Sequence, residues 1–269
     1  MKDKRILYVS SEVVPYLPET EIASTAFNVA KKAHSKGVQT RIFMPRFGVI
    51  NERRHQLHEV IRLSGMNLII NDMDMPLIIK VASIPKERMQ VYFIDNDEYF
   101  KRKAIFSDED DQLFSDNDER AIFFAKGVVE TVKKLNWAPD IIHVHGWMAS
   151  LLPLYLKEYY SEEPLFSESK IITSVYNQDF EGTLNEELID KIKFDKISDD
   201  KINILKEPNY TNILKSAVSN SDAIVHGSQE ISKELQEEIS KNDIPELSFQ
   251  QEDSFESYLN FYGELISEE

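Results

Sequence analysis

The chain has 269 residues with a formal net charge of −16, and 42% of the residues are hydrophobic, which is typical of a globular protein. The excess of carboxylates argues against nucleic acid and anionic membranes as partners, because both require a basic face. The absence of cysteine excludes disulfide and thiolate chemistry, and no stretch has the length of a secretion signal or a membrane span, so we expect a cytoplasmic protein.

The first part of the chain predicts a strand–helix–strand unit. The apolar run Arg5–Ser11 is typical of a buried parallel strand. Small and apolar residues then recur at helical spacing from Ile22 to Ala33, and Gly37 ends this helix. Val38–Pro45 predicts the second strand. Connections this short are those of a right-handed crossover.

The rest of the chain continues to alternate strands with helices. Two strands at 76–84 and 90–95 are expected to form a hairpin, and an acidic start and lysines at the end favour a helix over 116–135. The later elements are strands at 140–145, 170–176 and 222–228, helices at 147–160 and 228–241, and a charged excursion at 179–207 over the carboxyl edge. This order predicts an α/β fold with a doubly wound, mainly parallel, Rossmann-like sheet.

The end of the chain, Glu252–Glu269, predicts an amphipathic helix. Its apolar stripe consists of Phe255, Tyr258, Leu259, Tyr262 and Leu265–Ile266. We expect this helix to pack back on the sheet and to contribute several kcal/mol to stability. The alternative is an acidic amphipathic tail that awaits a partner.

Common cofactor motifs are absent. No G-x-G-x-x-G follows the first strand and no P-loop occurs, so nucleotide cofactors have little support. His143 and His145 share one face of a strand, but no third ligand has a recognisable spacing, so we expect no metal. Acidic pairs such as Asp95 and Asp97 could act as general acids or bases, although such pairs more often cap helices. We therefore expect no cofactor.

Several long motifs resemble those of bacterial glycogen and starch synthases. SEVVPY (11–16) resembles the family's SEVAPF, FIDNDEYF (93–100) its FIDNPEYF, and DNDERAIFFAKGVVE (116–130) its DNAERFAFFSRAALE. The resemblance covers most of residues 4–235 and implies the amino-terminal half of a GT-B fold. In this family that half mainly holds the α-glucan acceptor, and a second Rossmann-like domain holds most of the ADP-glucose donor. The implied reaction is glucosyl transfer to the non-reducing end of an α-1,4-glucan with retention of configuration.

One departure from the family follows the first strand. The family carries AKTGGLADV, whose lysine and glycines approach the phosphates of the nucleotide sugar, where this chain reads LPETEIAST. Pro18 stands at the lysine position, Thr20 and Glu21 at the glycine positions, and Ser24 at the aspartate position. Because a cation is lost and Glu19 and Glu21 are added, the resemblance implies that anionic ADP-glucose is repelled here.

A second departure falls at the carboxyl ends of two later strands. HVHGWMASLLPLYLK (143–157) resembles HCHDWHTALLPVYLK, with Gly146 in place of the aspartate and Met148 in place of the histidine that binds the sugar. TSVYNQDFEG (173–182) resembles TIHNLAYQG, with Tyr176 in place of a histidine, while Asn177 and Phe180 remain. A thioether cannot donate the hydrogen bonds that stabilise developing charge.

The candidate ligand-binding residues are polar and aromatic side chains at the carboxyl edge of the predicted sheet. They are Ser11, Glu12, Tyr16, Tyr99, His145, Trp147, Tyr176 and Asn177. The aromatic rings could stack on sugars or form a protein interface. We predict no catalytic residue, and we expect an α-glucan or a protein as the partner.

The chain is about half the size that two such domains require. We expect residues 1–241 to form the synthase-like domain and 242–269 to form a linker and a crossover helix packed on the same domain, with no donor-binding domain. The predicted function is that of a pseudoenzyme, inactive by itself and used for glucan binding, regulation or protein interaction. One alternative is a glucosyltransferase subunit that elongates α-1,4-glucan from ADP-glucose with a separate donor-binding partner. Another is an unrelated small-molecule binding protein that uses the same crevice.

Overall fold

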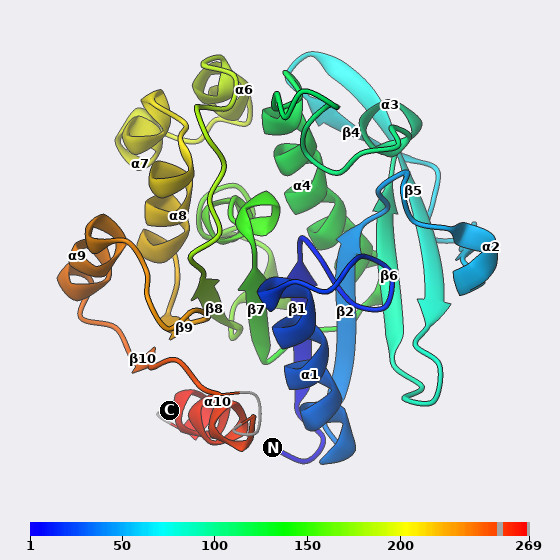
Figure 1. Ribbon diagram of the computed structural model, residues 1–269, viewed down its shortest axis with the longest axis vertical. Coiled ribbons are helices and arrows are strands. Elements are labelled where there is room, and N and C mark those ends of the chain that lie inside the picture. Colours follow the sequence, from blue (N-terminus) through cyan, green and yellow to red (C-terminus); the bar gives the residue numbers. More distant parts are fainter. Residues whose placement is uncertain (252–254, 268–269) are drawn as a thin grey trace.

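The computed structural model in Figure 1 describes residues 1–251 and 255–267. A ten-stranded sheet runs through the centre of the molecule, with helices packed against it. The strands are β1 (Arg5–Ser10), β2 (Gln39–Pro45), β3 (His58–Glu59), β4 (Met66–Ile70), β5 (Met73–Ser83), β6 (Gln90–Asp95), β7 (Ile141–His145), β8 (Lys170–Val175), β9 (Ala223–His226) and β10 (Glu246–Leu247).

Ten α-helices and three 3₁₀ turns connect these strands within the described residues. The helices are α1 (Glu21–Ser35), α2 (Glu52–His55), α3 (Asp97–Phe100), α4 (Asn117–Leu135), α5 (Leu152–Lys157), α6 (Leu188–Phe194), α7 (Asp199–Ile202), α8 (Tyr210–Ser219), α9 (Lys233–Lys241) and α10 (Glu256–Ser267). The 3₁₀ turns are η1 (Trp147–Ala149), η2 (Pro164–Phe166) and η3 (Asn203–Lys206). Over the described residues, no helix has the length and apolar character needed to cross a bilayer.

The strand order confirms the predicted doubly wound, mainly parallel sheet. The order is β10-β9-β8-β7-β1-β2-β6-β5-β3, with β4 paired to β5. Pairing is parallel from β10 to β6, whereas β5 runs antiparallel to β6 and forms the predicted hairpin. From β1 the chain first builds outward through β2 and β6 and then returns to the other side of β1 with β7. This reversal creates a crevice at the carboxyl ends of β1 and β7, the usual ligand position in such sheets.

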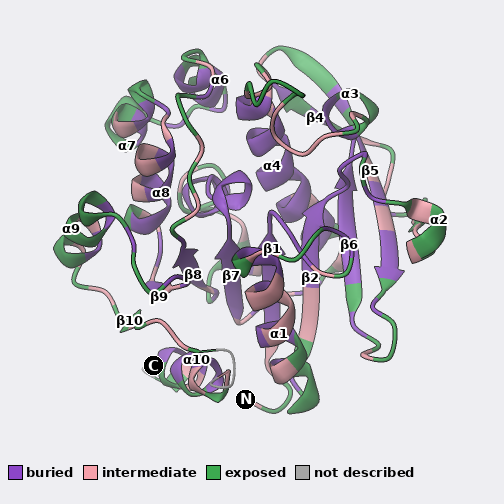
Figure 2. Cartoon of the chain, viewed as in Figure 1, coloured by how far each residue is buried: buried purple, intermediate pink, exposed green. Residues whose placement is uncertain are grey.

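Helices cover both faces of this sheet. On one face, α1 lies against β1 and β2 and also contacts α10. On the other face, α4 lies so close to β6 that a Cβ added at Gly127 would meet Ile94 at 2.8 Å, which explains why this helix carries a glycine. Figure 2 shows that the sheet and α4 are buried along most of their length. The core therefore consists of two apolar layers with the sheet between them.

The C-terminal helix packs back on the sheet, as predicted. Figure 1 shows α10 beside the end of α1, next to the amino terminus. Its buried side chains are Tyr258, Leu259, Phe261, Tyr262 and Leu265. At the surface, Glu256 lies 2.7 Å from Lys32 and 3.3 Å from Lys36, both on the α1 side. The first residues of the predicted span, 252–254, and the last two, 268–269, lie outside the described residues.

Some predicted boundaries were wrong. The helix predicted for 147–160 is the 3₁₀ turn η1 followed by the short α5, because Pro153 lacks an N–H and favours a fresh helix start. The helix predicted from 228 begins at Lys233, where the Ser232 hydroxyl accepts from the amide of Leu235 and caps it. The sequence also gave no indication of β3, β4, β10 or α8, since most of them are short and lack a clear alternation.

Candidate functional site

The crevice between β1 and β7 forms because the turns after these strands lie close together. The amide of Ser11 donates to the carbonyl oxygen of His145 at 2.9 Å. Gly146 has φ +81°, and a Cβ added there would lie 2.4 Å from Oγ of Ser11. The site therefore requires glycine both for its backbone conformation and for the close approach. The residues that follow, Glu12 and Trp147, consequently face one common cavity.

This cavity has a volume of about 420 Å³ and an aromatic wall. The ring centroids of Phe106 and Trp147 are 4.7 Å apart, and those of Trp147 and Phe180 are 5.0 Å apart in an edge arrangement. Phe180 continues the wall to Tyr210, 5.8 Å away. The complete lining is Glu12, Ile22, Phe106, Ser107, Asp111, Leu113, Trp147, Gln178, Asp179, Phe180 and Glu181. Aromatic faces beside polar groups suit a sugar ring or an apolar side chain.

The start of α4 holds Phe106 in this wall. Asn117 Nδ2 donates to the carbonyl oxygen of Phe106 at 2.8 Å, and Arg120 donates to that of Ile105 at 2.8 Å and to Oδ1 of Asn117 at 2.5 Å. Arg120 is fully buried, and this burial, together with the nearby Arg102 cation, lowers its pKa to about 9. The family-like motif DNDER therefore anchors the loop before α4 through a buried cation.

The amino terminus of α1 lies beside the same cavity and is occupied by the chain's own groups. Thr20 is the N-cap, and its hydroxyl accepts from the amide of Ala23 at 3.0 Å and donates to Oε2 of Glu12 at 2.8 Å. Glu12 is only 5% exposed, and burial raises the pKa of its carboxyl although the Thr20 bond acts in the opposite direction. The amino terminus of α1 is thus already capped by Thr20 and already has a carboxyl group, that of Glu12, beside it.

Two more carboxylates lie at this helix end. The Ser24 hydroxyl donates to Oε1 of Glu19 at 3.0 Å, and the Ser228 hydroxyl donates to Oε2 of Glu21. Within residues 1–251 and 255–267, no lysine, arginine or histidine forms an ion pair with Glu12, Glu19 or Glu21. Asp111, Asp179 and Glu181 add further negative charge to the cavity lining, which contains no cation. The ionisable side chains of the lining are therefore all acidic, which disfavours an anionic ligand.

The two histidines of β7 lie beneath the crevice in a buried polar layer. His143 forms hydrogen bonds with the Tyr262 hydroxyl through Nδ1 at 2.6 Å and with the Ser174 hydroxyl through Nε2 at 2.8 Å. His145 Nδ1 lies 2.8 Å from the Tyr176 hydroxyl. Burial lowers the pKa of His145 to about 3 and that of His143 well below its usual range, so both rings are neutral at pH 7.

The structure brings only some of the predicted site residues together. Glu12 and Trp147 share the cavity, whereas His145 and Tyr176 are buried in the polar layer and Asn177 is exposed outside the lining. Tyr176 therefore has no free ring face for a sugar.

Tyr16 and Tyr99 lie elsewhere. Tyr99 is buried and its hydroxyl donates to Glu119 at 2.9 Å, while Tyr16 lines a different hollow. At the positions that differ from the family, Met148 is fully buried and Pro18 is exposed. Asp95 is buried and pairs with Arg46 at 2.9 Å and with Lys80 at 3.0 Å, an arrangement typical of a structural ion pair.

Several lining residues were not among the sequence candidates. Phe106, Asp111, Asp179, Phe180 and Glu181 all line the cavity. Phe180 could have been found, because it matches an aromatic position in the family motif. Phe106 and Asp111 belong to the loop before α4, which has no periodic pattern, so only the tertiary fold brings them to the crevice.

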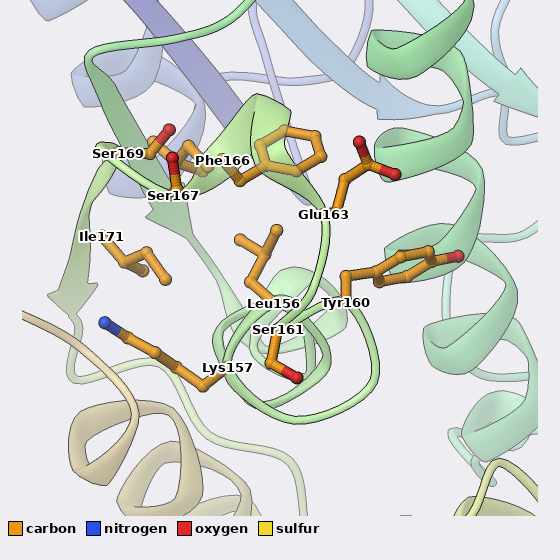
Figure 3. A pocket seen from close by; sticks show the side chains of 10 residues that line it. Leu156, Lys157, Tyr160, Ser161, Glu163, Phe166, Ser167, Ser169 and Ile171 are labelled. Carbon is orange, nitrogen blue, oxygen red and sulfur yellow. The ribbon is translucent and has the colours of Figure 1, made fainter.

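Other hollows differ from the crevice in character. The one in Figure 3 has a volume of about 150 Å³ and lies between α5 and the beginning of β8, with Lys157 and Ile171 among its lining residues. Its polar groups are matched internally, since Lys157 pairs with Asp222 at 2.7 Å and the Ser169 hydroxyl donates to the Pro139 carbonyl at 2.6 Å. Among the described residues, no group of three histidine or carboxylate side chains is placed to hold a metal ion.

Comparison with known proteins agrees with the fold. The sequence profile of the starch synthase catalytic domain matches residues 5–247. The chain belongs to this starch synthase family. It is 34% identical over 253 residues to the glycogen synthase of Chlorobium luteolum, an alignment that covers 93% of this chain and 50% of that enzyme. For the glycogen synthase of Chlorobaculum tepidum the identity is 33%, over 91% of this chain and 49% of the enzyme.

The chain spans about half the length of the curated glycogen synthases it matches. The catalytic domain of starch synthase IV from Arabidopsis thaliana, bound to ADP and acarbose, superimposes with a TM-score of 0.75 at 15% identity. The match covers 93% of this chain and 52% of that domain. The likeness at this identity shows the shared fold, the amino-terminal half of a starch synthase GT-B domain.

Proposed function

We propose that these 269 residues do not transfer glucose by themselves and instead act as a starch-synthase-like binding module, for an α-glucan, a regulatory ligand or a partner protein. The observation that carries this proposal is the amino terminus of α1. Its cap is the Thr20 hydroxyl, and Glu12, Glu19 and Glu21 surround it with no cation among the described residues. A helix end that would attract phosphate groups is therefore already surrounded by negative charge.

The chemistry on the β7 side supports the same proposal. Met148 is fully buried and offers no strong hydrogen-bond donor, and Gly146 has no side chain. Glycosyl transfer needs donor, acceptor and charge-stabilising groups held together. The aromatic wall remains, so binding without transfer is the activity that this crevice supports best. We also propose that residues 242–269, which carry β10 and α10, are a linker and crossover helix rather than a separate unit.

A transfer assay tests the first part of the proposal. The purified chain is incubated with radiolabelled ADP-glucose or UDP-glucose and glycogen, with the glycogen synthase of Chlorobium luteolum as the positive control and heat-killed chain as the blank. We expect incorporation equal to the blank. Transfer clearly above the blank would contradict the proposal. Transfer that appears only after addition of a separate donor-binding domain would favour the alternative of a split glucosyltransferase.

Binding is tested separately with maltoheptaose at millimolar concentration. We expect a change in Trp147 fluorescence that is lost in Phe180→Ala and retained in Tyr159→Phe, because Phe180 packs on Trp147 and Tyr159 lies outside the crevice lining. No fluorescence change at millimolar maltoheptaose would exclude the glucan and leave a regulatory ligand or a protein as the occupant.

A further inference from the structure

A second hollow in this acidic protein is lined by basic residues. It has a volume of about 560 Å³ and lies between the loop after β1, the end of α2 and the β5–β6 turn. Its lining consists of Tyr16, Arg54, His55, Gln56, Ser83, Ile84, Pro85, Lys86, Arg88 and Gln90. Three of these side chains are cations and none is a carboxylate. The chain has 47 acidic and 31 basic residues, so the positive charge of this hollow is opposite in sign to the net charge of the chain.

The acidic residues nearest in sequence are paired elsewhere. Glu87, between the two basic residues of the turn, lies 2.8 Å from Lys31. Glu52, at the start of α2, lies 2.7 Å from Lys80. No carboxylate in the described part of the chain lies within ion-pair distance of Arg54, Lys86 or Arg88. Three cations around one concave surface repel each other unless an anion lies between them.

The floor of this basic hollow contains an unmatched polar group. Tyr16 is 5% exposed, and its ring packs against Phe93 at 4.9 Å and His55 at 5.0 Å. Its hydroxyl is buried without a hydrogen-bond partner among the described residues, which is unusual for a tyrosine in a folded protein. Burial and the neighbouring Arg54 lower the pKa of His55, so its neutral ring can also donate one hydrogen bond.

The backbone that carries the cations is fixed. The amide of Ile84 donates to the carbonyl oxygen of Met89 at 2.9 Å, and the amide of Arg88 donates to that of Ile84 at 3.3 Å. On the other side, Gln56 in the αL conformation ends α2 just after His55, which follows Arg54. Arginine and lysine side chains on such ordered turns bind phosphate oxygens through charge-assisted hydrogen bonds. The volume lies within the range of small-molecule sites.

We propose that this basic hollow binds a dianionic phosphate group, with Arg54, Lys86 and Arg88 contacting the phosphate oxygens and Tyr16 donating from the floor. The inference is independent of the proposed function, because it uses a different cavity from the crevice. The relevant chemistry is that of a dianionic phosphate, either free or attached to a small polyol.

Isothermal titration calorimetry at constant ionic strength tests this, with ribose 5-phosphate and inorganic phosphate as probes and with ribose and chloride as controls. We expect both phosphates to bind and both controls to show no heat. Tighter binding of ribose 5-phosphate would identify a monoester, and equal binding would identify free phosphate. The double variant Arg54→Ala/Arg88→Ala should weaken binding at least about tenfold, because one charge-assisted hydrogen bond is worth that much or more. Tyr16→Phe should weaken it by a smaller factor.

The matched control is Lys233→Ala/Lys241→Ala, which removes the same number of charges from α9, outside the basic hollow. It should keep the affinity of the unchanged protein. Equal affinities in the two double variants, an affinity unchanged in Tyr16→Phe, or no phosphate binding at 10-fold molar excess over about 1 mM protein would overturn the proposal. Melting curves establish that each variant is folded, which is expected because Arg54 and Arg88 are exposed.

Discussion

The polar layer under α10 and the crevice above it contrast in burial and charge. In the layer, His143 has hydrogen-bond partners on both ring nitrogens and carries no charge. In the crevice, Glu12, Glu19 and Glu21 lie near one helix end without a cation among the described residues. The layer therefore consists of buried neutral groups held by hydrogen bonds, whereas the crevice concentrates carboxylates that repel one another and anionic ligands. Four predictions test this contrast.

Removal of α10 should have the largest effect. Truncation after Lys241 deletes five buried side chains, each worth roughly 1.5–3 kcal/mol, and exposes His143. We expect the melting temperature to fall by more than about 10 °C, or the protein to become insoluble. The control Glu256→Gln removes only the exposed pairs with Lys32 and Lys36 and should leave the melting temperature nearly unchanged. A soluble truncated chain with an unaltered melting temperature would show that α10 is a tail and not part of the core.

Lowering the pH should have the second-largest effect, because it destabilises the polar layer. Burial lowers the pKa of His145 to about 3 and that of His143 well below 6.5, so the unfolded chain takes up protons at a higher pH than the folded chain. The stabilisation is therefore fully present above about pH 6.5 and is lost as the pH falls from there towards the folded pKa values. Each histidine should reduce the free energy of unfolding by about 1.4 kcal/mol per pH unit in this range.

Urea unfolding at pH 7.0, 6.0 and 5.5 measures this slope. His145→Gln should reduce the slope by the contribution of one histidine, whereas His34→Gln, at an exposed position, should leave it unchanged. The same slope in all three proteins would mean that the buried histidines do not control the acid response.

Removing a single hydroxyl from the polar layer should have a smaller effect. Tyr262→Phe leaves Nδ1 of His143 buried without its partner, and we expect a loss of about 1–3 kcal/mol in the free energy of unfolding. Tyr159→Phe is the matched control, because Tyr159 is 43% exposed, and should change stability by less than about 0.5 kcal/mol. Chemical denaturation measures both. A loss of the same size in the two variants would mean that the His143 hydrogen bond adds nothing specific.

Charge removal in the crevice should have the smallest effect on stability. Asp179→Asn and Glu181→Gln neutralise two exposed lining residues, and we expect changes within about 0.5 kcal/mol, of either sign. Denaturation at low and at high salt checks this and also reports any repulsion between them. A loss comparable to that of Tyr262→Phe would show that these carboxylates support the fold and would remove the contrast between the two regions.

The sequence by itself determined the fold class, the hairpin of β5 and β6 and the C-terminal helix. These features follow from apolar periodicity, which extends over many residues and can therefore be recognised even where single positions deviate from the pattern. The motifs also pointed to the family, which the match over residues 5–247 shows. Short elements such as β3 and β10 could not be predicted, because two residues carry no period.

The crevice was only partly predictable. Sequence motifs placed Glu12 and Trp147 there, since both follow strands that a parallel sheet brings to one edge. They could not show that Tyr176 and His145 bond to each other in the interior, because motifs do not reveal which way a side chain points.

Only the tertiary structure decided where charge gathers. Arg54 and Arg88 are 34 positions apart, and their common surface with Tyr16 exists because the β1 loop, α2 and the β5–β6 turn meet in space. Likewise, Phe106 reaches the crevice through hydrogen bonds from Asn117 to its backbone. Local pattern determines elements because it acts over a few residues, whereas sites depend on contacts between distant residues, which only the folded chain makes.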